Sequence, residues 1–254
     1  MKNKNNEEIN INDAASKKKG LFKIIENIMR KVPNGGMLFV SIFILALYVF
    51  CMGVALTPGI LVFLKVQSLT SNSSEFIRAL GMAMSIGLGL FLFSFTIIFV
   101  VPLVNYPFIP FVRSYRGPWF SLESIPWYIH NALIYLVRYT ILDLITPSPL
   151  NILFYRMMGM KIGKGVMINT SNISDACLIE LEDYAVIGGS ASLMAHYGMK
   201  GYLIIDRLKI GRGSTIGLNA IIMGGVIIGE KVTMAPGSVA LPKTIIPDET
   251  KFGL

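Results

Sequence analysis

Residues 210–234 read IGRGSTIGLNAIIMGGVIIGEKVTM, and this stretch decides the fold. An aliphatic or methionine side chain returns at every sixth position, from Ile210 through Ile216, Ile222 and Ile228 to Met234. An amphipathic helix repeats about every 3.6 residues and a half-buried strand about every two, so neither explains a period of six. The period is typical of a parallel β-helix built from hexapeptides, in which each repeat makes one short strand and one turn.

The same period continues on the N-terminal side of this stretch. Leu181, Ile187 and Leu193 form a second run, and Ile162 and Ile168 form a third. No single repeat can bury its own apolar side chain, so the repeats must stack on one another to form a core. Small or β-branched residues follow the aliphatic positions four places later, at Val166, Ala185, Ala191, Ser214, Ala220, Val226, Val232 and Ser238.

The period is broken between Leu193 and Ile210, which are seventeen residues apart. Seventeen is not a multiple of six, so we expect about five extra residues to leave the coil around residues 197–201. His196, one of two histidines in the chain, stands where this excursion begins. Binding and catalytic residues are often carried on such surface excursions from a rigid scaffold.

Two long segments before the repeats carry no charge. They are residues 37–56, MLFVSIFILALYVFCMGVAL, and residues 79–104, ALGMAMSIGLGLFLFSFTIIFVVPLV. At about 1.5 Å per residue each can cross a hydrocarbon core of about 30 Å. The overall composition, 53% hydrophobic with a mean hydropathy of +0.61, is also too apolar for an ordinary soluble protein. We therefore predict two transmembrane helices.

A third apolar segment, residues 125–145, reads IPWYIHNALIYLVRYTILDLI and is interrupted by polar and charged residues. Tryptophans at 119 and 127 lie near its start. This pattern favours an amphipathic helix at the membrane surface over a third crossing. His130 is then interpreted as a polar residue at the level of the lipid headgroups.

The net charge of +8 is unevenly distributed along the chain. Residues 1–36 carry eight Lys/Arg against four Asp/Glu, whereas residues 161–254 carry nine against eight. The basic excess lies beside the apolar segments, which favours anionic lipid headgroups as partners and disfavours a nucleic-acid-binding protein. The basic flanks of the two apolar segments predict that both termini and the repeats are cytoplasmic.

These observations predict a mixed architecture of transmembrane helices followed by a β-helix. Cys51 and Cys177 are interpreted as small apolar residues, because no CxxC or other ligand spacing accompanies them. The expected segments are a cytoplasmic basic segment at 1–36, a two-helix transmembrane region at 37–118, an interfacial helix at 119–150 and the β-helix at 151–254.

The string IGLNAIIMGGVIIGEKVTMAPGSVALPKTIIP, residues 216–247, resembles the hexapeptide-repeat acyltransferases. The resemblance covers residues 151–254 and implies a left-handed β-helix and a homotrimer that binds acyl-CoA between subunits. Residues 151–166, NILFYRMMGMKIGKGV, together with two preceding spans and the SLMAH loop at 192–196, further resemble the membrane modules that end poly-amino-acid synthetases of the poly-lysine type.

The resemblance implies that His196 is the general base, since a histidine at the base of such a loop has that role in the family. Imidazole suits the step, because the acceptor hydroxyl or amine must lose a proton as it attacks a thioester. An acceptor is needed for its other ring nitrogen, and spacing cannot separate Asp206 from Glu182. The resemblance also implies acetyl-CoA or another acyl-CoA as co-substrate, with pantetheine and phosphate contacts at Gly217, Asn219, Ala235, Gly237, Ser238 and Lys243.

Two other functions stay open beside acyl transfer to a membrane-associated acceptor. One is amide-bond formation from an aminoacyl thioester on a carrier protein, and the other is a non-enzymatic trimeric membrane scaffold. We expect no metal, because a γ-type carbonic anhydrase needs three imidazoles and the repeat region holds only His196.

Overall fold

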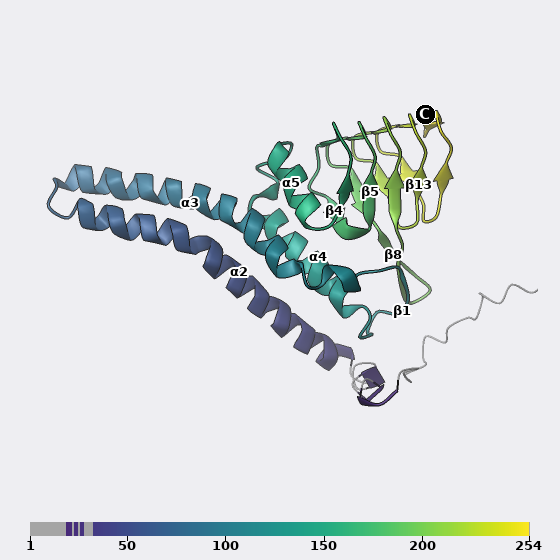
Figure 1. Ribbon diagram of the computed structural model, residues 1–254, viewed down its shortest axis with the longest axis horizontal. Helices are drawn as coiled ribbons and strands as arrows, with labels where there is room; N and C mark the ends of the chain where they lie inside the picture. Colours follow the sequence, from purple (N-terminus) through teal and green to yellow (C-terminus); the bar gives the residue numbers. More distant parts are fainter. Residues whose placement is uncertain (1–18, 22, 25, 28–32, 254) are drawn as a thin grey trace, which may run out of the picture.

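The computed structural model describes residues 19–253 apart from residues 22, 25 and 28–32. Most of the predicted basic segment at 1–36 therefore lies outside the described residues. Two regions follow it in Figure 1, a long helical hairpin and a stack of short strands, with a group of shorter helices between them.

The helical hairpin consists of α2 (Pro33–Leu69) and α3 (Glu75–Asn105), which run antiparallel beyond a bend in α2 (Figure 1). The two helices approach closely where glycines face each other: a Cβ atom at Gly59 would lie 2.8 Å from the Cα atom of Gly89. Many of the apolar side chains on the two helices are exposed. Both helices are long and apolar enough to cross a membrane. The predicted helices are thus present, and their insertion in a membrane stays a prediction.

The chain between the hairpin and the strands forms a connecting region. It contains η1 (Ile109–Phe111), β1 (Tyr115–Pro118), α4 (Ile125–Val137), the π-helical turn η2 (Arg138–Leu142) and α5 (Pro149–Met157). Helix α4 lies between the hairpin and the strands (Figure 1).

Helix α4 is covered by protein on both sides. On the hairpin side, Tyr48 of α2 donates a hydrogen bond to the Ala132 carbonyl at 2.6 Å. On the strand side, the Tyr135 hydroxyl is hydrogen-bonded to the Ser174 hydroxyl at 3.0 Å. The interpretation of His130 as a headgroup-level residue is wrong, because its side chain is fully buried, 3.2 Å from the Asn105 side-chain oxygen. A place for α4 at a membrane surface is untested.

Residues 161–252 form a three-sided parallel β-helix. The first face contains β2 (Lys161–Ile162), β5 (Ile179–Leu181), β10 (Leu208–Ile210), β13 (Ile227–Ile228) and β16 (Ile245–Ile246). The second contains β3 (Met167–Ile168), β6 (Val186–Ile187), β11 (Thr215–Ile216), β14 (Thr233–Met234) and β17 (Lys251–Phe252). The third contains β4 (Ile173–Ser174), β7 (Ser192–Met194), β12 (Ile221–Ile222) and β15 (Val239–Ala240). This arrangement fits a left-handed β-helix.

The predicted period of six is confirmed as the period of the core. Ile210, Ile216, Ile222, Ile228 and Met234 are each at most 1% exposed. Each strand pairs with the strand one full coil later on the same face, as in the pairing of β10 with β13. The core therefore runs along the axis of the β-helix, and its apolar side chains come from every coil.

The predicted break in the period is a β-hairpin that leaves the coil. Its strands are β8 (His196–Met199) and β9 (Tyr202–Ile205), and β1 pairs with β9 as a third antiparallel strand. Lys200 and Gly201 both have positive φ, 52° and 81°, as a two-residue hairpin turn requires. The excursion is wider than residues 197–201, because β9 pairs with β8 and β1 instead of with the coil.

Candidate functional site

The site lies on the edge of the β-helix where the third face turns into the first. One coil makes this turn at Asp175, after β4, and the next makes it through the hairpin, after β7. Strands β4 and β7 are paired so that Ser174 lies beside Met194. This pairing stacks the two turns and brings Asp175 next to His196.

Asp175 and His196 form a hydrogen-bonded pair. Nδ1 of His196 is 2.6 Å from Oδ2 of Asp175, the histidine side chain is 20% exposed, and the aspartate is fully buried. A carboxylate only accepts hydrogen bonds, so a neutral imidazole in this position carries its proton on Nδ1. The proton-accepting nitrogen of His196 is then Nε2.

The Asp175 carboxylate is held on its other side by helix α4. Oδ1 accepts a hydrogen bond from Nε1 of Trp127 at 2.5 Å and one from Nδ2 of Asn131 at 2.7 Å. The side-chain oxygen of Asn131 accepts from the backbone N–H of Asp175 at 2.8 Å. The Trp127 ring also lies edge-on to the His196 ring, with centroids 4.9 Å apart. A buried carboxylate needs such donors to stay ionised.

The expectation that Asp206 or Glu182 binds the second ring nitrogen of His196 is wrong. The carboxylate hydrogen-bonded to Nδ1 of His196 is Asp175. Asp206 accepts a hydrogen bond from the backbone N–H of Arg207 at 2.9 Å. Glu182 lies 2.6 Å from Nζ of Lys209, and this hydrogen bond lowers the pKa of the glutamate. Glu182 is on the edge between the first and second faces, so the triangular coil carries its side chain away from the edge of His196.

Sequence reasoning missed Asp175, Trp127 and Asn131. The paired residues Ile173 and Leu193 are twenty positions apart instead of eighteen, because the 3₁₀ turn η3 (Ala176–Leu178) adds residues after Asp175. A period of six therefore does not predict that the turn at Asp175 stacks on the turn at His196. For the two residues of α4, no local pattern indicates that they face a turn more than forty positions later.

The residues expected to contact acyl-CoA fall on two edges of the prism. Lys243 is exposed and shares the edge of the hairpin: a Cβ atom at Gly225 would lie 2.9 Å from Cγ of Lys243 and 3.2 Å from Oδ2 of Asp206. The other five lie in two stacked turns between the second and third faces, at Gly217, Asn219, Ala235, Gly237 and Ser238. Their roles in binding acyl-CoA stay predictions.

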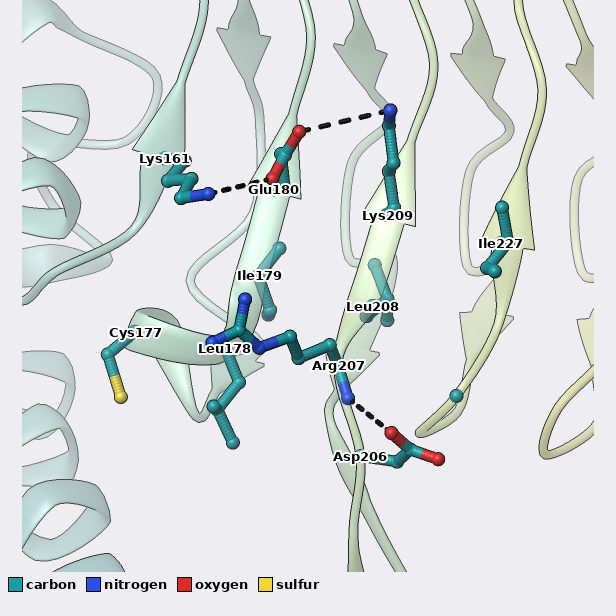
Figure 2. A pocket seen from close by; sticks show the side chains of 11 residues that line it. Lys161, Cys177, Leu178, Ile179, Glu180, Asp206, Arg207, Leu208, Lys209 and Ile227 are labelled. Atoms are coloured by element: carbon teal, nitrogen blue, oxygen red, sulfur yellow. Dashed lines mark hydrogen bonds and ion pairs between the residues drawn. The ribbon is translucent and has the colours of Figure 1, made fainter. Parts of the chain in front are cut away.

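A pocket of 320 Å³ opens on the first face beside the hairpin edge. Figure 2 shows a row of alternating charges across it, in which Glu180 lies between Lys161 at 3.2 Å and Lys209 at 3.9 Å. Burial raises the pKa of the Cys177 thiol at its margin to about 12. This thiol is protonated near neutral pH and is a poor nucleophile. His196 does not line this pocket.

The described part of the chain holds no group of three or more His, Cys, Asp or Glu residues placed to bind a metal ion. The hydrogen bond between His196 and Asp175 supports proton transfer at Nε2 of His196. Aspartate on one imidazole nitrogen fixes the tautomer and stabilises the imidazolium that forms when the other nitrogen takes up a proton.

No family model matches the chain, and no curated protein matches it in sequence. Among solved structures, it is similar to a hexapeptide-repeat acetyltransferase from Vibrio cholerae O1 biovar eltor complexed with acetyl coenzyme A. That match has 26% identity and a TM-score of 0.32, and it covers 35% of this chain and 52% of that one. The chain thus spans about half the length of the Vibrio protein.

Two further structures are similar over larger shares of this chain. A maltose O-acetyltransferase from Clostridium difficile 630 matches at 18% identity and a TM-score of 0.37, over 56% of this chain and 90% of that one. A serine acetyltransferase from Brucella abortus strain S19 matches at 15% identity and a TM-score of 0.35, over 90% of this chain and 73% of that one.

Proposed function

We propose that the chain is a membrane-anchored acyltransferase that moves an acyl group, in the first instance acetyl, from acyl-CoA to a hydroxyl or amine of a membrane-associated acceptor. The observation that carries this proposal is the pairing of His196 with the buried Asp175 at the base of a hairpin that leaves the β-helix. A histidine so held is equipped to act as a general base.

The reaction needs no covalent enzyme intermediate. Nε2 of His196 takes the proton of the acceptor O–H or N–H while the acceptor oxygen or nitrogen bonds to the thioester carbonyl carbon. The tetrahedral intermediate then collapses, the C–S bond breaks, and the coenzyme thiolate leaves with the proton from the imidazolium. Asp175 stabilises the imidazolium between these two steps.

A membrane-associated acceptor is favoured by where the pair lies. Asp175 contacts α4 directly, and α4 in turn packs against the two long apolar helices. If those helices cross the membrane, His196 is close to the bilayer, where a lipid-linked or membrane-generated acceptor is at hand. The proposed location is the cell membrane, with both termini and the β-helix in the cytoplasm, where acyl-CoA is available, and with anionic lipids around the basic flanks.

We also propose a homotrimer, with acyl-CoA bound between β-helices near Gly217, Asn219, Ala235, Gly237 and Ser238 on one copy. Apolar side chains on the outside of the first face support association of copies, since Ile227 is 46% exposed, Ile245 is 70% exposed, and the two residues are partners on neighbouring strands. Exposed aliphatic residues that adjoin one another are typical of an interface.

The scaffold alternative predicts a disordered excursion and a solvent-directed His196, whereas the excursion is a hairpin that pairs with β1 in a three-stranded sheet and His196 is hydrogen-bonded to Asp175. The amide-forming alternative uses the same His196–Asp175 pair with a different donor, an aminoacyl thioester on a carrier protein. Binding of acetyl-CoA distinguishes the two functions, because a carrier-dependent enzyme should not bind acetyl-CoA.

The test uses membranes that contain the full chain, supplied with acetyl-CoA labelled in the acetyl group. We expect label to enter a membrane-bound product and to fall by about a hundredfold or more in His196→Ala. Tyr135→Phe is the matched control, because it removes a hydrogen bond between α4 and the β-helix without touching His196 or Asp175. An unchanged rate in folded His196→Ala would remove His196 from the mechanism, and no binding of acetyl-CoA to the purified wild type would favour the carrier-dependent donor.

A further inference from the structure

We infer that helix α4 sets the reactive state of His196 from outside the β-helix, with Asn131 and Trp127 as positioning residues for the His196–Asp175 pair. This inference rests on the proposed function of His196 as the base. It goes further, because it assigns control of that base to a segment that the repeat pattern does not include.

Asn131 holds Asp175 through two hydrogen bonds, one to the carboxylate and one to the backbone. Its amide N–H donates to Oδ1 of Asp175 at 2.7 Å, and its oxygen accepts from the Asp175 backbone N–H at 2.8 Å. Asp175 has φ of 59°, a left-handed conformation that few residues other than glycine adopt without cost. The two bonds made by Asn131 hold both the backbone and the carboxylate of Asp175 in that conformation.

Trp127 acts on both members of the pair. Its Nε1–H donates to the same Oδ1 atom at 2.5 Å, and its ring lies edge-on to the His196 imidazole. With Oδ1 occupied by two donors from α4, Oδ2 is the oxygen that faces Nδ1 of His196. The proton of the neutral ring is thereby held on Nδ1, and Nε2 is kept in the form that accepts a proton.

Helix α4 is itself held by the two apolar helices, on either side of Asn131. At the next position, the Ala132 carbonyl accepts a hydrogen bond from Tyr48 of α2 at 2.6 Å. At the preceding position, His130 is 3.2 Å from the side-chain oxygen of Asn105, the last residue of α3. A continuous set of contacts therefore joins both apolar helices to the carboxylate that orients His196.

A purely structural role for Asn131 and Trp127 predicts loss of stability without a change in the proton position on His196. The two explanations separate in the ¹⁵N spectrum of the full chain labelled at histidine, which contains two imidazoles. His130→Gln assigns the two. In wild type, we expect the neutral His196 ring to carry its proton on Nδ1 and to leave Nε2 unprotonated.

The variants are Trp127→Phe, which keeps a ring against His196 and removes one donor, and Asn131→Leu, which removes both hydrogen bonds to Asp175. In both we expect the His196 signals to move toward a mixture of tautomers, further in Asn131→Leu. The control Tyr135→Phe leaves them unchanged. Wild-type signals in folded Trp127→Phe and Asn131→Leu overturn the inference, and if Asn131→Leu does not fold, Trp127→Phe decides alone.

An activity measurement adds a second readout. We expect kcat to fall by about tenfold or more in Asn131→Leu with little change in KM for acetyl-CoA, because the substrate contacts are intact and only the base is disturbed. A change in KM alone contradicts the inference. The spectrum does not depend on catalysis. Shifted tautomers in the variants of a protein without acyl transfer would refute the proposed function and leave the role of α4 standing. Unshifted tautomers in the variants of an active enzyme would refute the role of α4 and leave the proposed function standing.

Discussion

Replacing Asp175 with asparagine tests the chemistry of the site with the smallest change of shape. Asparagine tolerates a left-handed backbone, so the φ of 59° at this position is kept. The new amide must present either its oxygen or its NH₂ group to the two donors from Trp127 and Asn131. With the oxygen toward those donors, the NH₂ group faces Nδ1 of His196 and forces the proton of the ring onto Nε2.

The size of the effect follows from the alternative orientation. Turning the amide so that its oxygen faces His196 leaves two buried donors of α4 without an acceptor, at about 1–3 kcal/mol each. The active tautomer is then disfavoured by about 2–6 kcal/mol, which corresponds to a loss of about 30-fold to about 10⁴-fold in rate. Transfer of labelled acetyl from acetyl-CoA measures this loss, and circular dichroism checks the fold. A folded Asp175→Asn protein that keeps more than about a third of the wild-type rate refutes this account of the pair.

Two predictions concern the helical regions. Gly59→Ala should lower the free energy of unfolding by about 1–3 kcal/mol, because its Cβ would lie 2.8 Å from Gly89 Cα. Gly53→Ala is the control, since a Cβ atom there meets open space. Equal melting temperatures of the two variants in detergent would contradict this prediction. Burial lowers the pKa of His130 from 6.5 to about 4. The unfolded chain then binds more protons between these values, so about 3 kcal/mol of stability is present above pH 6.5 and lost as the pH falls to 4. His130→Gln should lose less over that range in denaturant titrations, and an identical pH dependence would count against it.

The periodic parts of this protein could be predicted from local sequence. A residue every six positions faces the axis of the coil wherever the repeat continues, so the period alone predicts that Ile210 and Met234 are core residues, and both are buried. Uncharged stretches of helical length predicted α2 and α3 in the same way. A break in the period located the hairpin to within a few residues, because an insertion must leave a stacked coil.

Sequence alone thus determined the stack of hexapeptide repeats, the two long apolar helices and the presence of His196 at a break, since each depends on spacing along a few neighbouring residues. Tertiary structure alone decided that Asp175 holds His196 and that Trp127 and Asn131 hold Asp175. These contacts join residues 21, 48 and 44 positions apart through the stacking of two turns and the packing of α4. The physical reason is that hydrogen bonds across elements depend on where whole helices and coils come to rest, and no local period encodes that placement.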